Sequence, residues 1–132
     1  LLRALPAHDR LLAIEIDPVF AARLKEWNDP RLIVHQGSAT DIRAVLAEHG
    51  LQAPHAVVSG IPFSLLPRTA ALDLLRSIWT ALAPGGRFVA YQYRGQVAVL
   101  GREVLGEPQR SMIELLNVPP TRFFSWYKPL VA

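Results

Sequence analysis

The chain has 132 residues, 51% of them hydrophobic and 19% charged, which fits one folded domain over residues 1–132 and argues against disorder. It contains no cysteine, so disulfides, thiolate metal sites and cysteine nucleophiles are excluded. No apolar run approaches the roughly 18 residues of a membrane span, and no signal-peptide pattern is visible. We therefore expect a cytoplasmic protein, with a peripheral role on the inner face of the membrane left open.

The net charge of +3 lies entirely in the last third of the chain. Residues 1–86 carry eight basic and eight acidic groups, whereas residues 87–132 carry six basic groups and three acids. A basic excess suits an anionic partner, such as a lipid surface or nucleic acid. An ordinary solvated surface accounts for the same excess, so charge alone does not choose a partner.

The first well-marked element is an apolar strand over Leu11–Ile16. A fully apolar strand is typical of a parallel sheet that is buried on both faces. Asp17-Pro18 then predicts a helix N-cap followed by proline in the first turn. This helix should end at residues 28–30, which read Asn-Asp-Pro. Its predicted buried face consists of Phe20, Leu24 and Trp27.

Strands and helices alternate along the rest of the chain until a pair of strands closes it. The expected strands are Leu32–His35, Ala56–Ser59, Arg87–Tyr93, Arg110–Asn117 and Arg122–Tyr127. The expected helices bury Ile42, Val45 and Leu46, then Leu72, Leu75, Trp79 and Leu82, and then cover Gln96–Leu105. Such alternation predicts an α/β fold with a doubly wound, mostly parallel sheet. The last two strands predict an antiparallel hairpin at its edge.

The strand ends carry the candidate functional groups, because open parallel sheets bind ligands beyond the carboxyl ends of their strands. A carboxylate such as Glu15 can accept hydrogen bonds from both hydroxyls of a ribose. The next strand end, at Ser38-Ala39, can offer backbone groups to the edge of an adenine. Together they predict an adenosine pocket. The alternative for Glu15 is an interaction with the dipole of the following helix, although Asp17 already fills that role.

Several stretches carry a family resemblance. Ala13-Ile14-Glu15-Ile16-Asp17, the Pro84-Gly85-Gly86 turn before a strand and the closing hairpin resemble the S-adenosylmethionine-dependent methyltransferases of the Rossmann-like class. The segment from His55 to Pro67 resembles the fourth-strand motif of bacterial phospholipid N-methyltransferases, and Asn117-Val118-Pro119-Pro120 is similar to their late Asn-x-Pro-Pro turn. The resemblance runs from about residue 11 to about residue 127, and it implies a Rossmann-like fold.

The resemblance also implies a reaction and a set of site residues. The reaction is transfer of a methyl group from S-adenosylmethionine to the amine of phosphatidylethanolamine or a related phospholipid, with a phospholipid headgroup or an anionic membrane surface as partner. The implied cofactor-binding residues are Glu15, Ile16, Ser38, Ala39, Ser59 and Gly60. The implied substrate-binding residues are Ile61, Pro62, Tyr91 and Tyr93, of which Tyr93 joins Ser59 as a catalytic candidate. Strand packing is the alternative role for both tyrosines.

The chain departs from the family pattern at two places. Related methyltransferases often carry an acid where this chain has Ser38; Asp41 is nearby, but is better explained as a helix cap. The family's glycine-rich loop lies roughly 20 residues before the acidic ribose ligand, whereas only fourteen residues precede Glu15 and none is glycine. The expectation is an N-terminally truncated domain without its first strand and that loop. The sheet edges left unpaired by the missing strand could then pair between copies of the chain, so a homo-oligomer is a further expectation.

Two other functions compete with phospholipid methylation. RNA adenine N6-dimethyltransferases share the Ala-Ile-Glu-x-Asp strand and have an Asn-Leu-Pro-Tyr motif. This chain has Ser59-Gly60-Ile61-Pro62-Phe63 instead, in which Phe63 could stack on a base but no Asn or Asp precedes the proline to bind its amine. RNA is therefore the less favoured substrate, and the small basic excess agrees. The other alternative is an inactive, truncated methyltransferase fragment. The four histidines show no metal-ligand spacing, so no metal is expected.

Overall fold

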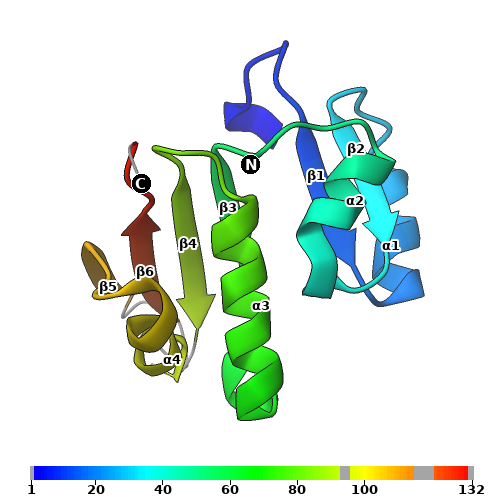
Figure 1. Ribbon diagram of the computed structural model, residues 1–132. Coiled ribbons are helices and arrows are strands. Elements are labelled where there is room, and N and C mark those ends of the chain that lie inside the picture. The colour runs from blue at the N-terminus through cyan, green and yellow to red at the C-terminus, as the bar shows by residue number, and fades with distance from the viewer. Residues whose placement is uncertain (1, 93–95, 115–120, 131–132) are drawn as a thin grey trace. The chain divides into compact units, whose positions relative to one another are not determined.

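The computed structural model describes residues 2–92, 96–114 and 121–130 of the 132-residue chain (Figure 1). The chain divides into two compact units, unit 1 over Leu1–Asp41 and unit 2 over Ile42–Ala132. The prediction that residues 1–132 form one domain stays a prediction.

Unit 1 contains a two-stranded parallel sheet and one α-helix. Strand β1 covers Leu11–Glu15, helix α1 covers Pro18–Lys25 and strand β2 covers Leu32–Gln36. The two strands pair in register from Leu11 opposite Leu32 to Glu15 opposite Gln36. Short 3-10 turns cover Leu2–Ala4 and Ala39–Asp41. The strand–helix–strand order predicted from the sequence is confirmed.

Asp17 begins helix α1 in the way that the sequence predicts. Its carboxylate accepts hydrogen bonds from the backbone N–H groups of Val19, at 2.8 Å, and Phe20, at 3.4 Å. These two donors have no partner inside the helix, so the cap replaces bonds that the first turn cannot make itself. Pro18 takes the first helical position, where its missing N–H costs nothing.

The predicted burial of unit 1 is wrong at two points. Phe20 and Trp27 are 53% and 67% exposed, and the fully buried residue of α1 is Ala21. Trp27 lies beyond the last residue of the helix, Lys25, so helical spacing no longer sets its direction. Strand β1 is half-buried along its length instead of fully buried. Within the described part of unit 1, a single eight-residue helix covers the two strands, which is too little to bury both faces.

An ion pair holds the connection between α1 and β2. The carboxylate of Asp29 binds the Arg31 guanidinium twice, at 2.6 Å from Nη2 and 3.0 Å from Nε, and accepts the Arg31 backbone N–H at 2.9 Å. Arg31 Nη1 also donates to the carbonyl oxygen of Leu5 at 2.5 Å. One guanidinium therefore joins the start of β2 to the segment that precedes β1, and it lowers the pKa of Asp29 to about 2.

Unit 2 contains a four-stranded mixed sheet in the order β3-β4-β6-β5. Strands β3 (Ala56–Ser59) and β4 (Arg87–Gln92) are parallel, whereas β6 (Thr121–Tyr127) runs antiparallel to β4 and to β5 (Arg110–Glu114). Figure 1 shows β4 and β6 as neighbouring arrows of opposite direction. The predicted hairpin at the sheet edge is confirmed. Residues 115–120, which include most of its predicted turn, lie outside the described residues.

Three α-helices complete unit 2, namely α2 (Ile42–Glu48), α3 (Arg68–Ala81) and α4 (Gln96–Leu105). The predicted buried face of α2 is confirmed. The predicted stripe of α3 is partly wrong: Leu75 and Leu82 are fully buried, whereas Leu72 and Trp79 are half-buried. Leu74 and Ile78 are buried in their place. The buried face of α3 is therefore rotated from the predicted one, because α3 also packs against α2 and α4.

Trp126 forms the centre of the unit 2 core. Its ring has no exposed surface and stacks on Phe88, with the ring centroids 5.4 Å apart. A Cβ atom on Gly101 of α4 would lie 2.6 Å from the Trp126 ring, so the absence of a side chain at Gly101 lets this helix approach closely. The indole N–H donates to the Gly106 carbonyl at 2.9 Å, which satisfies the one polar group of the buried ring.

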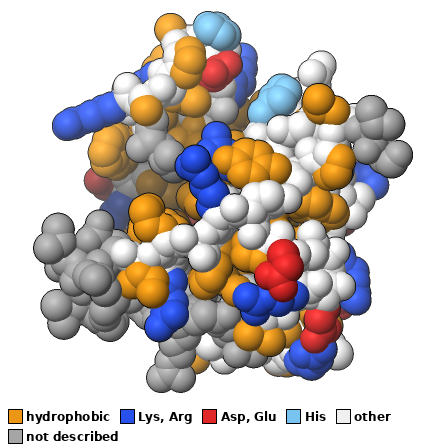
Figure 2. Space-filling model, turned by 90° about the vertical axis from the view of Figure 1, so that its left-hand side faces the viewer, with side chains coloured by type: hydrophobic (Ala, Val, Ile, Leu, Met, Phe, Trp, Pro, Cys, Tyr) orange, Lys and Arg blue, Asp and Glu red, His pale blue; other side chains and the backbone are white. Residues whose placement is uncertain are grey.

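The hairpin also presents apolar side chains to solvent. Met112 and Ile113 of β5 are both exposed, and the neighbouring residues in the sheet include Arg110 and Arg122. Figure 2 views the molecule from the side of β5 and shows hydrophobic side chains at the surface between Lys and Arg side chains. No helix in the described part of the chain is long and apolar enough to cross a bilayer.

The strands form two sheets among the described residues, with β1 paired to β2 and β3 paired to β4. Parallel pairs followed by an antiparallel hairpin agree with the predicted α/β class. The absence of a first strand and of a glycine-rich loop stays a prediction, as does an oligomer formed through sheet edges.

Asp29→Asn is expected to destabilise the chain above about pH 4, with a loss that shrinks as the pH falls toward about 2. Arg31 keeps the pKa of the folded-state carboxyl at about 2, against an ordinary value of 3.8. The ionised form therefore favours folding above the ordinary value, and this contribution disappears as the pH falls through the folded value. Urea unfolding followed by circular dichroism across this pH range measures the difference.

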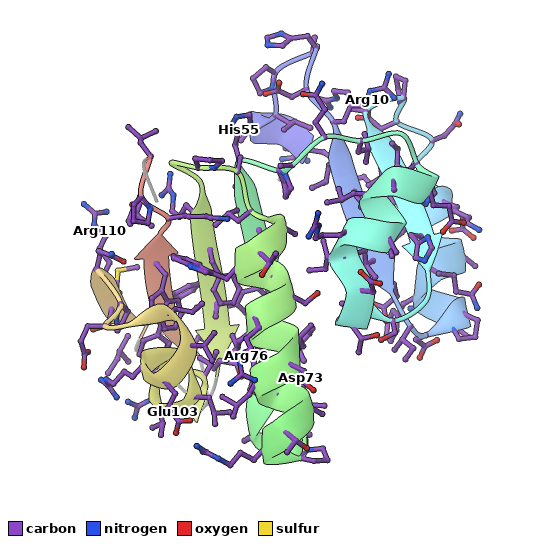
Figure 3. The ribbon with its side chains drawn as sticks, in the orientation of Figure 1. Arg10, His55, Asp73, Arg76, Glu103 and Arg110 are labelled. Carbon is purple, nitrogen blue, oxygen red and sulfur yellow. The ribbon has the colours of Figure 1, made fainter. Side chains whose placement is uncertain are left out.

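The matched control is Asp73→Asn. Asp73 and Arg76 lie along α3 (Figure 3) and form an exposed pair at 3.4 Å, of a kind that contributes little to stability. Equal destabilisation by the two substitutions near neutral pH would contradict the role assigned to Asp29.

Candidate functional site

The carboxyl end of the unit 1 sheet gathers four of the predicted site residues. Because β1 and β2 are parallel and in register, Glu15 lies opposite Gln36, and the Gly37 N–H donates to the Glu15 carbonyl at 2.9 Å. Ile16 follows Glu15 and is exposed, and Ser38-Ala39 follow Gly37. The adenosine-binding candidates of this unit therefore share one edge.

Glu15 is half-buried and has one hydrogen bond in its own turn. Its Oε1 accepts the Asp17 backbone N–H at 3.1 Å, while Asp17 caps α1. A carboxylate offers about four acceptor positions, so this single bond leaves Glu15 the capacity to receive two hydroxyl groups. The interaction with the start of the helix and a ligand-binding role are therefore compatible.

Ser38 closes the turn after β2. Its Oγ accepts the Thr40 N–H at 3.2 Å and donates to Thr40 Oγ1 at 3.0 Å. The hydroxyl thus shapes the turn that leads into the Ala39–Asp41 3-10 helix. Any contact of this turn with a base would be made by its backbone, as expected for a position that lacks the acid of related enzymes.

The carboxyl end of β3 in unit 2 carries the loop that the sequence analysis singled out. Ser59 is buried at the strand end, opposite Ala90 of β4. Its Oγ accepts the Ile61 N–H at 3.2 Å, which bends the chain directly after the strand. Two residues further on, the fully buried ring of Phe63 anchors the far side of the loop. The loop, Gly60–Pro62, is therefore attached to the core at both of its ends.

The last two residues of β4 contact this loop from opposite faces of the sheet, because successive strand residues point in opposite directions. The Tyr91 ring, which is 45% exposed, lies against Gly60: a Cβ atom there would come within 2.5 Å of its Cζ and Oη. Gln92 is only 7% exposed. Its Nε2 donates to the Ile61 carbonyl at 2.5 Å, and its Oε1 accepts the Phe63 N–H at 3.3 Å.

The structure therefore brings together the unit 2 candidates Ser59, Gly60, Ile61, Pro62 and Tyr91. Tyr91 also packs near Phe123, with the ring centroids 6.3 Å apart, so strand packing accounts for part of its position. Tyr93, predicted as a catalytic and substrate-binding residue, lies outside the described residues.

Gln92 is the residue of this edge that the sequence analysis did not predict. A signal for it was present, because Phe88, Ala90 and Gln92 alternate on the face of β4 that is buried. A carboxamide on such a face requires hydrogen-bond partners inside the protein. The loop after β3 supplies them, at Ile61 and Phe63.

Comparisons with known proteins bear on the fold of the chain and on its sequence resemblance. No protein-family model matches the chain. The chain is 35% identical over 81 residues to an ornithine lipid N-methyltransferase of Singulisphaera acidiphila. That stretch covers 60% of this chain and 42% of the relative, so it spans less than half of the relative's length.

Solved structures show the same fold at low sequence identity. N-methyltransferase NodS from Bradyrhizobium japonicum, in complex with S-adenosyl-L-homocysteine, matches with a TM-score of 0.70 and 14% identity, over 91% of this chain and 67% of NodS. The 1,6-didemethyltoxoflavin N1-methyltransferase of Burkholderia thailandensis matches with a TM-score of 0.66 and 16% identity, over 91% of this chain and 61% of that enzyme. The chain has the Rossmann-like fold of class I S-adenosylmethionine-dependent methyltransferases, as predicted, and resembles a lipid N-methyltransferase in sequence.

Gly60→Ala is expected to displace the Tyr91 ring and leave unit 2 folded. The added Cβ would overlap the far end of the Tyr91 side chain, which can swing outward because it is partly exposed. We expect a cost of about 1 kcal/mol, at the low end for overpacking. Chemical shifts of the Tyr91 ring protons and thermal unfolding measure the two effects. The same substitution in a Tyr91→Ala background should be almost neutral; an equal cost there would show that the ring is not what Gly60 accommodates.

Proposed function

We propose that this chain takes part in S-adenosylmethionine-dependent transfer of a methyl group to the amine of a phospholipid or amino lipid. The observation that carries the proposal is the 35% identity to an ornithine lipid N-methyltransferase, which adds a substrate class to the fold. Phosphatidylethanolamine is the acceptor that the sequence motifs favour. An amino lipid such as ornithine lipid offers the same chemical group, a primary amine at a membrane surface.

The proposed cofactor contacts in each unit are the residues that the family resemblance implies. Glu15 would accept the ribose hydroxyls, while Ile16 and the Ser38-Ala39 backbone would contact the adenine. Ser59 and Gly60, at the end of β3, would lie toward the part of the cofactor that carries the methyl group. Each set is at the carboxyl end of a parallel strand pair, where ligands of open α/β sheets bind.

The residues of unit 2 suit the positioning of an amine. When bound, S-adenosylmethionine supplies a methyl group activated by its positively charged sulfur. The attacking amine must be unprotonated and aligned behind that methyl group, so the protein's main task is alignment. The partly exposed Tyr91 ring can attract a cationic headgroup by a cation–π interaction. Ile61 and Pro62 would line the path of the acceptor, and Tyr93, in the segment after β4, is proposed to orient its amine.

The proposed partner is a phospholipid headgroup or an anionic membrane surface. The last third of the chain carries the whole net charge of +3, and its hairpin exposes Met112 and Ile113 beside arginines. Met112 shares one face of β5 with Arg110, and Ile113 lies on the other face opposite Arg122, so an apolar side chain neighbours a basic one on each face of this edge strand. Apolar side chains beside basic ones are the combination that binds peripheral proteins to anionic lipids. A peripheral location at the inner face of the membrane would follow from this partner.

Glu15→Ala is expected to weaken the binding of S-adenosylhomocysteine by more than tenfold, because two ribose hydroxyls would lose a charged acceptor. Isothermal titration calorimetry measures the dissociation constant directly. Glu26→Ala, which removes an exposed carboxylate just beyond α1, is the matched control and should bind as the original chain does. An unchanged affinity of Glu15→Ala for S-adenosylhomocysteine would contradict the proposal that Glu15 binds the ribose hydroxyls.

The test of the whole proposal is a methylation assay with several acceptors. We expect methyl transfer from labelled S-adenosylmethionine to phosphatidylethanolamine or ornithine lipid in vesicles, and none to ribosomal RNA. Transfer to RNA alone would establish the adenine-methylating alternative. A chain that binds no cofactor, but gains binding when an upstream strand and glycine-rich loop are added, would establish the inactive-fragment alternative.

A further inference from the structure

The carboxamide of Gln92 connects the end of β4 to two backbone groups of the loop that follows β3. It donates to the Ile61 carbonyl and accepts from the Phe63 N–H, on the two sides of Pro62. The two bonds need a donor and an acceptor on one side chain, in a fixed orientation. A carboxamide of this length meets that need, whereas an ionised carboxylate lacks the donor and Asn lacks one methylene of reach.

The loop depends on this support because its own residues provide few hydrogen bonds beyond the Pro62 carbonyl, which accepts the Leu65 N–H at 2.9 Å. Gly60 adds conformational freedom, and Pro62 has no N–H to donate. Within the loop, the Ser59 hydroxyl binds the Ile61 N–H at 3.2 Å, which leaves the Ile61 carbonyl to be oriented by Gln92. Since Phe63 is fully buried, loss of Gln92 would leave a buried N–H without its partner, which is costly.

The two Gln92 hydrogen bonds lie at the end of the loop that is proposed to contact the methyl acceptor, and not at the end proposed to contact the cofactor. Gln92 binds Ile61 and Phe63, around the residues proposed to line the path of the acceptor. The Ser59–Gly60 end, proposed to face the cofactor, is set instead by the strand pairing of Ser59 with Ala90 and by the Tyr91 ring. A change at Gln92 should therefore act mainly on the acceptor half.

We propose that Gln92 is a positioning residue that sets the conformation of Ile61-Pro62 and, through it, the alignment of the acceptor amine. This inference rests on the proposed methyl transfer. Gln92 touches neither substrate nor cofactor; it acts through the two backbone groups that it holds. Its loss should lower the efficiency of transfer to the lipid amine without a matching loss of cofactor affinity.

The structural half of the inference is tested by hydrogen exchange of the Phe63 amide, followed by nuclear magnetic resonance. Gln92→Met, of similar length but without hydrogen-bonding groups, should speed exchange of this amide by at least about tenfold. Gln109→Met is the matched control, because Gln109 Oε1 accepts the Tyr127 N–H at 3.0 Å in the hairpin. Gln109→Met should speed exchange of the Tyr127 amide and leave the exchange rate of the Phe63 amide unchanged. Unchanged Phe63 exchange in Gln92→Met would overturn the inference.

Gln92→Glu supplies a conservative rescue. Its carboxyl has both a donor and an acceptor only when protonated. When the carboxyl is ionised, one of its oxygens takes the place of the donor and repels the Ile61 carbonyl oxygen, so the side chain cannot hold both backbone groups. The protection factor of the Phe63 amide, corrected for intrinsic exchange, should therefore rise as the pH is lowered in Gln92→Glu and not in Gln92→Met. The same pH response in both variants would contradict a specific role for the donor to Ile61.

The functional half is tested by kinetics with phosphatidylethanolamine vesicles and by titration with S-adenosylhomocysteine. We expect kcat/KM for the lipid to fall at least about tenfold in Gln92→Met, while the dissociation constant for S-adenosylhomocysteine changes less than about twofold. The kinetic control is Gln52→Met, at an exposed glutamine between α2 and β3, which should retain both values. An equal loss of cofactor affinity, or unchanged kinetics, would overturn the positioning role. If the unaltered chain transfers no methyl group, the proposed function fails, whereas the Phe63 exchange still decides whether Gln92 holds the loop.

Discussion

The parallel pairing of β3 with β4 is the constraint on which the candidate site of unit 2 depends. Because Ser59 lies opposite Ala90, the chain leaves β3 just where Tyr91 and Gln92 complete β4. One side chain then covers Gly60 from the open face, and the other binds the loop from the buried face. Phe63 and Trp126 fill the core of the same unit, so the site loop is supported by the best-buried part of the chain.

In unit 1, too, the parallel pairing of two strands places the candidate site residues side by side. The register of β1 with β2 places Glu15 beside the turn that contains Ser38, and Asp17 caps the start of α1 directly after this strand end. The Asp29–Arg31 pair fastens the return of the chain into β2. With only five residues per strand and one short helix, this unit has little buried surface. Polar contacts in its turns therefore matter more to its shape than they do in unit 2.

Sequence patterns predicted the order of strands and helices well, because caps, breakers and apolar runs act locally. Asp17-Pro18 began a helix, and the apolar spacing of Ile42, Val45 and Leu46 identified a buried face correctly. The errors arose where neighbours in space decide burial. Phe20 has the spacing of a core residue but is exposed, and the buried face of α3 follows its contacts with α2 and α4.

The sequence by itself determined that Glu15 ends an apolar strand, that Ser59–Pro62 follows another, and that a hairpin closes the chain. These features depend on residues that are adjacent in sequence. Only the tertiary structure decided which side chains hold the loop after β3, because Gln92 and Ile61 are separated by 31 positions and meet through strand pairing. The alternation of β4 indicates that a buried carboxamide at position 92 needs hydrogen-bond partners. The sequence alone does not identify those partners, because they are determined by the register of the sheet.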